Sequence, residues 1–265
     1  MLLFQHIPKT AGTAFRLYIL DNIGSAFAAY YGREPETHPA LRTLDINDED
    51  AVRTAIASNG IRLIQAHDIR PFFNIFPDVP VLCCLREPKQ RALSNYFHIL
   101  RGGGTDAEMS NRLRSGELDL VGYVRANNHV YSDILRWIDG AGHPIALCFH
   151  ERLNEAVTLL NERLGWKGRL QQRNLSSGQE HFRAAQLIAE NGAELSAALA
   201  EDTALYETAL RTWDEGPGKT AFLDLMANAP PRYSGLDGPR LRYRLKQLQL
   251  KIRPDTPRNT SGKAW

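Results

Sequence analysis

A short segment near the N-terminus has the composition of an anion-binding turn. A largely apolar run over residues 2–7 stops at Pro8, and the segment that follows contains Lys9, Thr10, Gly12 and Thr13. Lysine supplies positive charge, the hydroxyls supply donors, and glycine lets the backbone approach a ligand closely. If a helix begins here, its unpaired N–H groups and its dipole add to the attraction for phosphate-type oxygens.

The spacing of this segment differs from that of a Walker P-loop. That motif has the form Gly-x-x-x-x-Gly-Lys-Ser/Thr, with the lysine directly after the second glycine. Here Lys9 precedes Gly12. The alternative to an anion site is an ordinary strand-to-helix turn with an exposed lysine.

Two further polar positions follow apolar runs. His67 comes after residues 61–66, and Arg86 comes after the almost wholly apolar residues 79–85. The imidazole of a histidine such as His67, with an ordinary pKa of about 6.5, is suited to accept a proton at neutral pH. The alternatives are a merely exposed or structural histidine, and a salt bridge of Arg86 with Glu87 or Asp78.

The elements that must position these groups alternate between strands and helices. Strands are predicted at 2–7, 61–66, 79–85 and 145–149. Helices are predicted at 48–58, from 88 to the glycines 102–104, within 105–140, at 152–164 and over most of 179–214. The last helical run is predicted to break at Gly192 and to end at 216–218. Residues 25–47 are predicted to be a loop or short irregular segment. Alternation of this kind predicts a three-layer α/β domain with a central parallel sheet.

In such sheets, ligands bind at the carboxyl ends of the strands. Lys9, His67 and Arg86, together with Ser94 on the helix after Arg86, are therefore expected to meet at one edge. This convergence predicts an active site.

The charge distribution divides the 265-residue chain. Residues 229–265 contain nine Lys or Arg against two Asp, a net charge of +7, and since the whole chain carries +2, residues 1–228 carry −5. We expect one α/β domain over 1–228 and a basic C-terminal tail over 229–265. The tail is either solvated or in weak contact with an anionic surface. No nucleic-acid partner is predicted, and no pattern predicts the oligomeric state.

The apolar segments and the cysteines bear on the cellular compartment of the protein. No apolar run approaches the roughly 20 residues of a membrane span, and no leader pattern precedes the first strand. Cys83, Cys84 and Cys148 all lie in strand-like runs, which favours reduced core thiols over disulfides or a metal site. We expect a cytoplasmic protein without a bound metal.

Two motifs resemble those of the carbohydrate sulfotransferase superfamily. They are His6-Ile7-Pro8-Lys9-Thr10-Ala11-Gly12-Thr13, and Leu85-Arg86-Glu87-Pro88 followed by Arg91-Ala92-Leu93-Ser94-Asn95-Tyr96. Within the superfamily the likeness is closest to the heparan sulfate 2-O-sulfotransferase branch and its bacterial relatives. These enzymes use 3′-phosphoadenosine 5′-phosphosulfate (PAPS) and release 3′-phosphoadenosine 5′-phosphate (PAP).

The resemblance implies roles for the residues of both motifs. The 5′-phosphosulfate would be held by Lys9, Thr10, Ala11, Gly12 and Thr13, and the 3′-phosphate by Arg86 and Ser94. It also implies a P-loop NTPase-like sulfotransferase fold with helical insertions. The resemblance covers residues 1–215 in all. Its weaker part involves residues 127–135, residues 151–166, Asn174 and Leu205-Tyr206. Two departures are Glu87, where many relatives have Asp, and Ala66 before His67, where relatives often have Gly.

The reaction that the resemblance implies moves a sulfuryl group from PAPS to a hydroxyl, which we expect to be one on a sugar or glycoconjugate. His67 would take the acceptor's proton, and Lys9 would neutralise growing charge, so that no metal is required. The alternatives are a P-loop-like nucleotide kinase or phosphotransferase and a non-catalytic nucleotide-binding protein. The sequence does not identify the acceptor. We expect residues 25–47 and 105–140 to select it, with the basic tail as a further candidate segment.

Overall fold

The computed structural model describes residues 1–103, 107–171 and 178–227. The predicted basic tail at 229–265 and Asn174 lie outside this part of the chain. Within it, none of the helices is long and apolar enough to cross a membrane.

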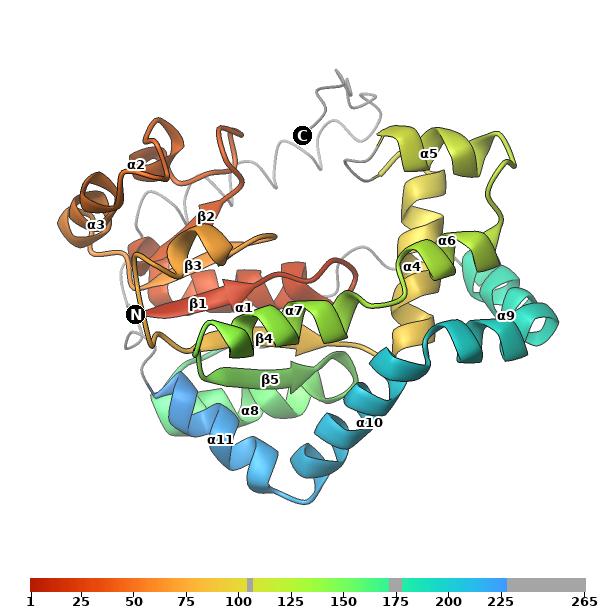
Figure 1. Ribbon diagram of the computed structural model, residues 1–265. Coiled ribbons are helices and arrows are strands. Elements are labelled where there is room, and N and C mark those ends of the chain that lie inside the picture. Colours follow the sequence, from red (N-terminus) through yellow and green to blue (C-terminus); the bar gives the residue numbers. More distant parts are fainter. Residues whose placement is uncertain (104–106, 172–177, 228–265) are drawn as a thin grey trace.

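A five-stranded, fully parallel sheet forms the centre of the fold (Figure 1). Its strands are β1 (Leu2–Gln5), β2 (Phe27–Tyr30), β3 (Leu63–Ala66), β4 (Val81–Leu85) and β5 (Ile145–Phe149), in the spatial order β2-β3-β1-β4-β5. The chain builds one half of the sheet from β1 through β2 and β3, and then crosses to β4 on the other side of β1. This reversal beside the central strand is where open α/β sheets form a ligand crevice at their carboxyl ends.

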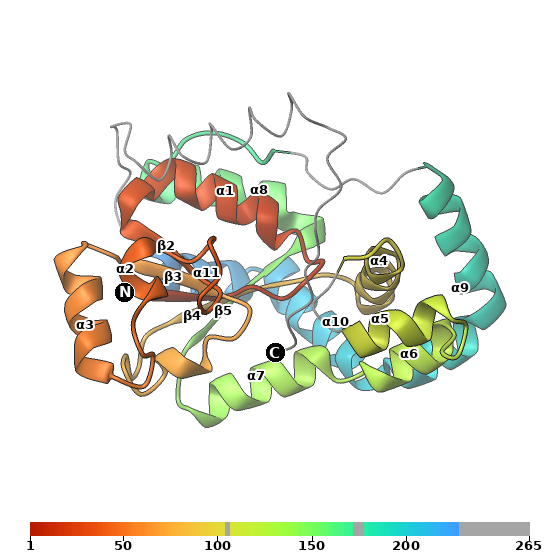
Figure 2. The same cartoon turned by 90° about the horizontal axis from the view of Figure 1, so that it is seen from above.

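Helices connect and cover the strands. The longer ones are α1 (Gly12–Ile23), α3 (Glu49–Ser58), α4 (Pro88–Leu100), α5 (Ala107–Arg114), α6 (Leu120–Ala126), α7 (Val130–Gly140), α8 (Leu153–Leu164), α9 (Gly178–Ala198), α10 (Ala200–Asp214) and α11 (Pro217–Met226). Short turns of helix are α2 (Pro39–Arg42), η1 (Gly24–Ala26), η2 (Arg70–Phe72) and η3 (His150–Arg152). Figure 2 shows α1 and α8 along one face of the sheet and α7 along the other. The predicted three-layer α/β architecture is confirmed.

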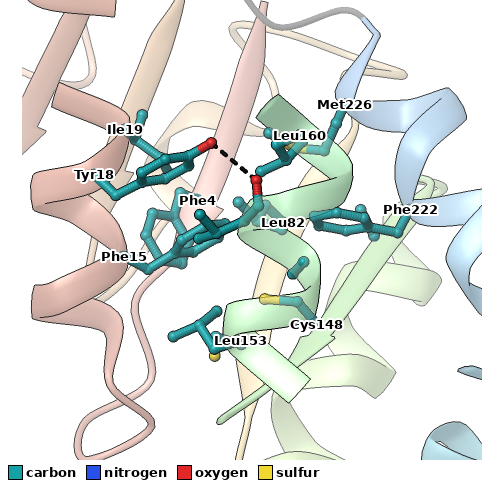
Figure 3. Packing of buried hydrophobic residues seen from close by; sticks show 14 of the residues in the cluster. Phe4, Phe15, Tyr18, Ile19, Leu82, Cys148, Leu153, Leu160, Phe222 and Met226 are labelled. Atoms are coloured by element: carbon teal, nitrogen blue, oxygen red, sulfur yellow. Dashed lines mark hydrogen bonds between the residues drawn. The ribbon is translucent and has the colours of Figure 1, made fainter. Parts of the chain in front are cut away.

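Alternate residues of the strands pack on opposite faces of the sheet, in two hydrophobic clusters. Phe4 and Leu82 pack with α1, α8 and α11 in one cluster (Figure 3), whereas Leu3 and Cys83 pack with α3 and α7 in the other. Because both faces are covered, the inner strands are apolar at nearly every position. A third cluster joins α4, α5, α6 and α9 beyond the carboxyl ends of the strands.

The prediction of a loop or short irregular segment over 25–47 was wrong in part, since only residues 31–38 and 43–47 lie outside the helices and strands. Residues 27–30 form β2, which pairs along its length with β3, and residues 39–42 form the short helix α2. The sequence Phe-Ala-Ala-Tyr is short, and alanine is depleted in strands, so pairing with β3 decides its conformation.

The helical run predicted over 179–214 ends before Gly216, as predicted, since α10 stops at Asp214. The sequence did not predict the helix that follows: α11 begins at Pro217, which occupies the first helical position, where its missing N–H costs nothing. His143 lies in the loop between α7 and β5, where it is buried and its Nδ1 lies 2.9 Å from the carbonyl oxygen of Val79. The break predicted at Gly192 occurs one residue earlier, as a kink at Asn191. The three cysteines are buried free thiols, as predicted.

Candidate active site

The turn between β1 and α1 presents a row of unpaired backbone donors. Lys9 and Ala11 both adopt left-handed backbone conformations, with φ of 71° and 63°, and α1 begins without a side-chain cap. In the described chain, no group accepts a hydrogen bond from the N–H groups of residues 9–14. Successive free N–H groups at a helix start form an anion-binding site.

Buried contacts fix the shape of this turn. The Thr10 hydroxyl donates to the carbonyl of Ile7 at 2.9 Å, and the Cys84 thiol donates to the carbonyl of Thr10 at 3.0 Å. Thr10 is completely buried, so its backbone N–H, rather than the hydroxyl predicted as a donor, is the group left for a ligand. The Thr13 side chain is half-buried and makes no hydrogen bond with any described residue.

Gly12 is required by the side chain of His6. A Cβ atom at position 12 would lie 2.0 Å from Cδ2 of His6, far inside van der Waals contact. The His6 ring is itself buried and fills the space behind the start of α1. The helix can therefore begin this close to β1 only with glycine at its first position.

Lys9 lies in a cationic environment. Its side chain is half-buried and forms no ion pair within the described residues. Burial lowers the pKa of Lys9, and the positive charges of Arg101 and Arg86 lower it further. A ligand anion would relieve this repulsion, whereas the exposed lysine of an ordinary turn would not experience it.

Arg86 follows β4 and reaches across to the Lys9 turn. Its Nη1 donates to the carbonyl of Lys9 at 3.3 Å, and its Nε is enclosed without a partner among the described residues. The hydroxyl of Tyr131, on α7, accepts from the Arg86 N–H at 3.0 Å and donates to the Arg86 carbonyl at 2.6 Å. Burial lowers the pKa of Arg86, although nearby Glu151 opposes this effect.

The salt bridge considered for Arg86 is not found in the described chain. The Glu87 carboxylate instead caps α4, where it accepts from the N–H groups of Lys89 and Gln90 at 3.1 and 2.7 Å. A glutamate at this position is therefore compatible with the fold. Ser94 lies further along α4, half-buried and without a hydrogen bond to a described residue.

His67 stands one residue beyond β3 with one ring nitrogen free. Its Nδ1 lies 2.8 Å from the carbonyl oxygen of His6, which can only accept, so Nδ1 carries the proton. The Nε2 lone pair of the neutral ring then faces away without a partner in the described chain. The ring is solvent accessible on its edge and stacks on His6, with centroids 4.6 Å apart.

The surroundings keep His67 neutral. Packing against neighbouring rings removes hydration and lowers the pKa of His67, the hydrogen bond to His6 opposes this, and the charge of Arg16 lowers the pKa further. A neutral imidazole with a free Nε2 is the form that can accept a proton.

Three residues that were not predicted from the sequence, Tyr31, Arg16 and Gln65, form a hydrogen-bonded group at this edge of the sheet. The hydroxyl of Tyr31, directly after β2, accepts hydrogen bonds from Arg16 Nη1 at 3.0 Å and Gln65 Nε2 at 2.9 Å. The sequence contains one signal for this group of hydrogen bonds: Gln65 is an amide within an otherwise apolar buried strand. A buried amide requires a polar partner.

The burial of His6 predicts that stability depends on pH. Burial lowers the pKa of His6 well below 6.5, and the charges of His67 and Arg16 add to the effect. Below about 6.5 the unfolded chain binds a proton that the folded protein does not, so the free energy of unfolding should decrease as pH falls from 6.5 toward the folded-state pKa. Urea unfolding at several pH values measures this slope. His6→Asn should reduce the slope to the contribution of His67, and an unchanged slope would contradict this assignment.

The fold and the site together define a class, an α/β protein with a turn of unpaired backbone N–H groups and a histidine at the carboxyl edge of a parallel sheet. No protein-family model and no curated protein matches the sequence. A crystal structure of a sulfotransferase from Alicyclobacillus acidocaldarius is similar to this chain with a TM-score of 0.41 and 18% identity, over 75% of this chain and 95% of that one. A similarity of this size does not establish a shared function.

Proposed function

We propose that this protein is a sulfotransferase that moves the sulfuryl group of PAPS to a hydroxyl of a sugar or glycoconjugate. The observation that carries the proposal is the arrangement at one sheet edge: a turn with unpaired N–H groups and an unpaired lysine adjoins a cationic arginine and a neutral histidine with a free Nε2. The turn with its lysine and the arginine belong to the two motifs that resemble those of sulfotransferases, whereas His67 follows β3 and lies outside both motifs.

The donor would occupy the anion-binding turn. The N–H groups of residues 9–14 and the Lys9 ammonium supply donors and charge for the 5′-phosphosulfate, with the Thr13 hydroxyl beside them. Arg86 and Ser94 supply a guanidinium and a hydroxyl for the 3′-phosphate. Each of these groups lacks a competing carboxylate partner in the described chain, so each has capacity left for a ligand.

The chain's own residues can support in-line transfer. As the acceptor oxygen bonds to sulfur, His67 Nε2 takes the hydroxyl proton, and the bond from sulfur to the 5′-phosphate oxygen breaks. Lys9 and the turn's N–H groups stabilise the negative charge that collects on the departing oxygen. PAP and the sulfated acceptor are the products.

The setting of this activity is proposed on the same basis. The three buried free thiols are compatible with a reducing compartment, and we place the protein in the cytoplasm. The domain would extend over residues 1–228, and the basic tail at 229–265 would make at most weak contact with an anionic surface.

Nucleotide binding tests the proposal directly. A thermal-shift titration with PAP should raise the melting temperature without Mg²⁺, because a ligand that binds only the folded state adds about 2.7 kcal/mol at 100 times its Kd. ATP and ADP, each with and without Mg²⁺, serve as comparisons. A shift by ATP only with Mg²⁺ would favour the phosphotransferase alternative, and no shift by any nucleotide would contradict the proposal.

Arg86→Ala is the matching variant for this titration. It should weaken PAP binding roughly 10- to 100-fold in calorimetry, because a charged hydrogen bond contributes about 1.5–3 kcal/mol. It should leave 5′-AMP, which lacks the 3′-phosphate, nearly unaffected. Arg125→Ala, which removes an exposed arginine of α6, controls for the change in net charge.

A further inference from the structure

Tyr31 lies beside His67 because the register of two strands places them there. Strands β2 and β3 pair with Tyr30 opposite Ala66, so the next residues, Tyr31 and His67, leave the sheet at the same level. The centroids of their rings are 5.2 Å apart, and the ring planes are tilted by 52°. Tyr31 is half-buried and His67 is exposed at its edge, so both can be reached from solvent.

The hydrogen bonds of the Tyr31 hydroxyl leave its proton available. Arg16 Nη1 and Gln65 Nε2 both donate to this oxygen, and a guanidinium can only donate. The two accepted bonds use both lone pairs of the phenol oxygen. No described residue accepts the remaining O–H proton, just as no described residue donates to His67 Nε2.

Rigid elements hold this hydroxyl in place. Gln65 is fully buried within β3, and Arg16 is on α1, the helix that begins at the anion-binding turn. The Tyr31 backbone N–H donates to the Thr37 hydroxyl at 2.8 Å, and Thr37 is buried as well. The phenol is therefore fixed relative to both the base and the turn.

We propose that Tyr31 is a further catalytic residue, whose hydroxyl donates a hydrogen bond to the attacking oxygen of the acceptor. This inference rests on the proposed sulfuryl transfer. An acceptor hydroxyl has one proton and two lone pairs. Its proton points to His67 Nε2, one lone pair accepts from Tyr31, and the other lone pair faces the sulfur atom.

The proton balance of the step is unchanged by Tyr31. His67 takes the acceptor's proton, the new oxygen–sulfur bond forms as the old one breaks, and Tyr31 keeps its own proton throughout. The contribution of Tyr31 is orientation, because a correctly oriented nucleophile reacts faster than one that rotates freely. Its removal should slow turnover without weakening donor binding.

The test compares Tyr31→Phe with the wild-type protein under single-turnover conditions. Formation of PAP from PAPS is followed with water and with a set of methyl glycosides as acceptor probes, and the Kd for PAP is measured by calorimetry. Tyr31→Phe should form PAP about tenfold more slowly and keep the wild-type Kd. In a variant that also carries His67→Ala, the Phe substitution should cause little further loss, since both residues act on one oxygen.

Tyr30→Phe is the matched control, because Tyr30 points to the opposite face of β2 and packs edge-on against Phe72. It should leave turnover unchanged. A wild-type rate in Tyr31→Phe, or equal losses of rate, PAP affinity and melting temperature, would overturn the role of Tyr31 while leaving the proposed function intact. A wild-type protein that neither binds PAP nor converts PAPS would instead overturn the proposed function.

Discussion

His67→Ala is expected to slow sulfuryl transfer by roughly 10²- to 10⁴-fold, the usual contribution of a general base. The hydroxyl of an alcohol is a weak nucleophile at neutral pH, and His67 Nε2 is the neutral acceptor next to the anion-binding turn. The Kd for PAP should remain close to the wild-type value, because His67 contacts neither phosphate in the proposed arrangement. Single-turnover rates and calorimetry measure the two quantities separately.

The pH profile provides a second measure of the same role. Because its surroundings lower the pKa of His67, the wild-type rate should rise with pH only below about 6.5 and be flat at neutral pH. His67→Ala should lose this acidic limb. His129→Ala, which removes an exposed histidine paired with Glu201, should retain both rate and profile. A variant lacking His67 that keeps the wild-type rate would show that another group takes the proton.

Lys9→Met is expected to lower the turnover rate by roughly 10²- to 10³-fold, the typical cost of removing one group that stabilises developing charge. Methionine keeps the length of the side chain and removes only the ammonium. The unliganded protein should not lose stability, since the substitution removes repulsion between Lys9 and both Arg101 and Arg86. Turnover of PAPS and the melting temperature without ligand are the two measurements.

Lys89→Met is a suitable control for this variant, because it removes the same charge from the first turn of α4. It should leave turnover within a few-fold of wild type. If Lys9→Met lowered the melting temperature strongly while sparing the rate, Lys9 would be a structural residue of the turn.

The arrangement of the main site residues could be predicted because each one follows a run of buried apolar residues. Parallel pairing brings the carboxyl ends of β1, β3 and β4 together, so the positions of Lys9, His67 and Arg86 at one edge follow from the pattern. The structure confirms this placement, and the chemical roles of these residues remain predictions.

Tyr31 could not be predicted because its position depends on tertiary pairing. The strand before it, β2, is four residues long and has alanine at half of its positions, so its local preference for strand is weak. The hydrogen bonds among Tyr31, Arg16 and Gln65 join separate parts of the chain. The buried amide of Gln65 indicates that a polar partner exists, but sequence spacing does not identify that partner. The inward orientation of the Thr10 hydroxyl was also missed, because it depends on a local hydrogen bond to the carbonyl of Ile7 that the residue types do not indicate.

The contact between His6 and Gly12 restricts how this sequence can evolve. The His6 ring occupies the space that any side chain at position 12 would need. A mutation that adds a side chain at position 12 can be accommodated only after position 6 has become smaller, and a smaller residue there would withdraw the ring that supports His67. Position 6 must therefore change before position 12 can, and this first change would already remove part of the support of His67.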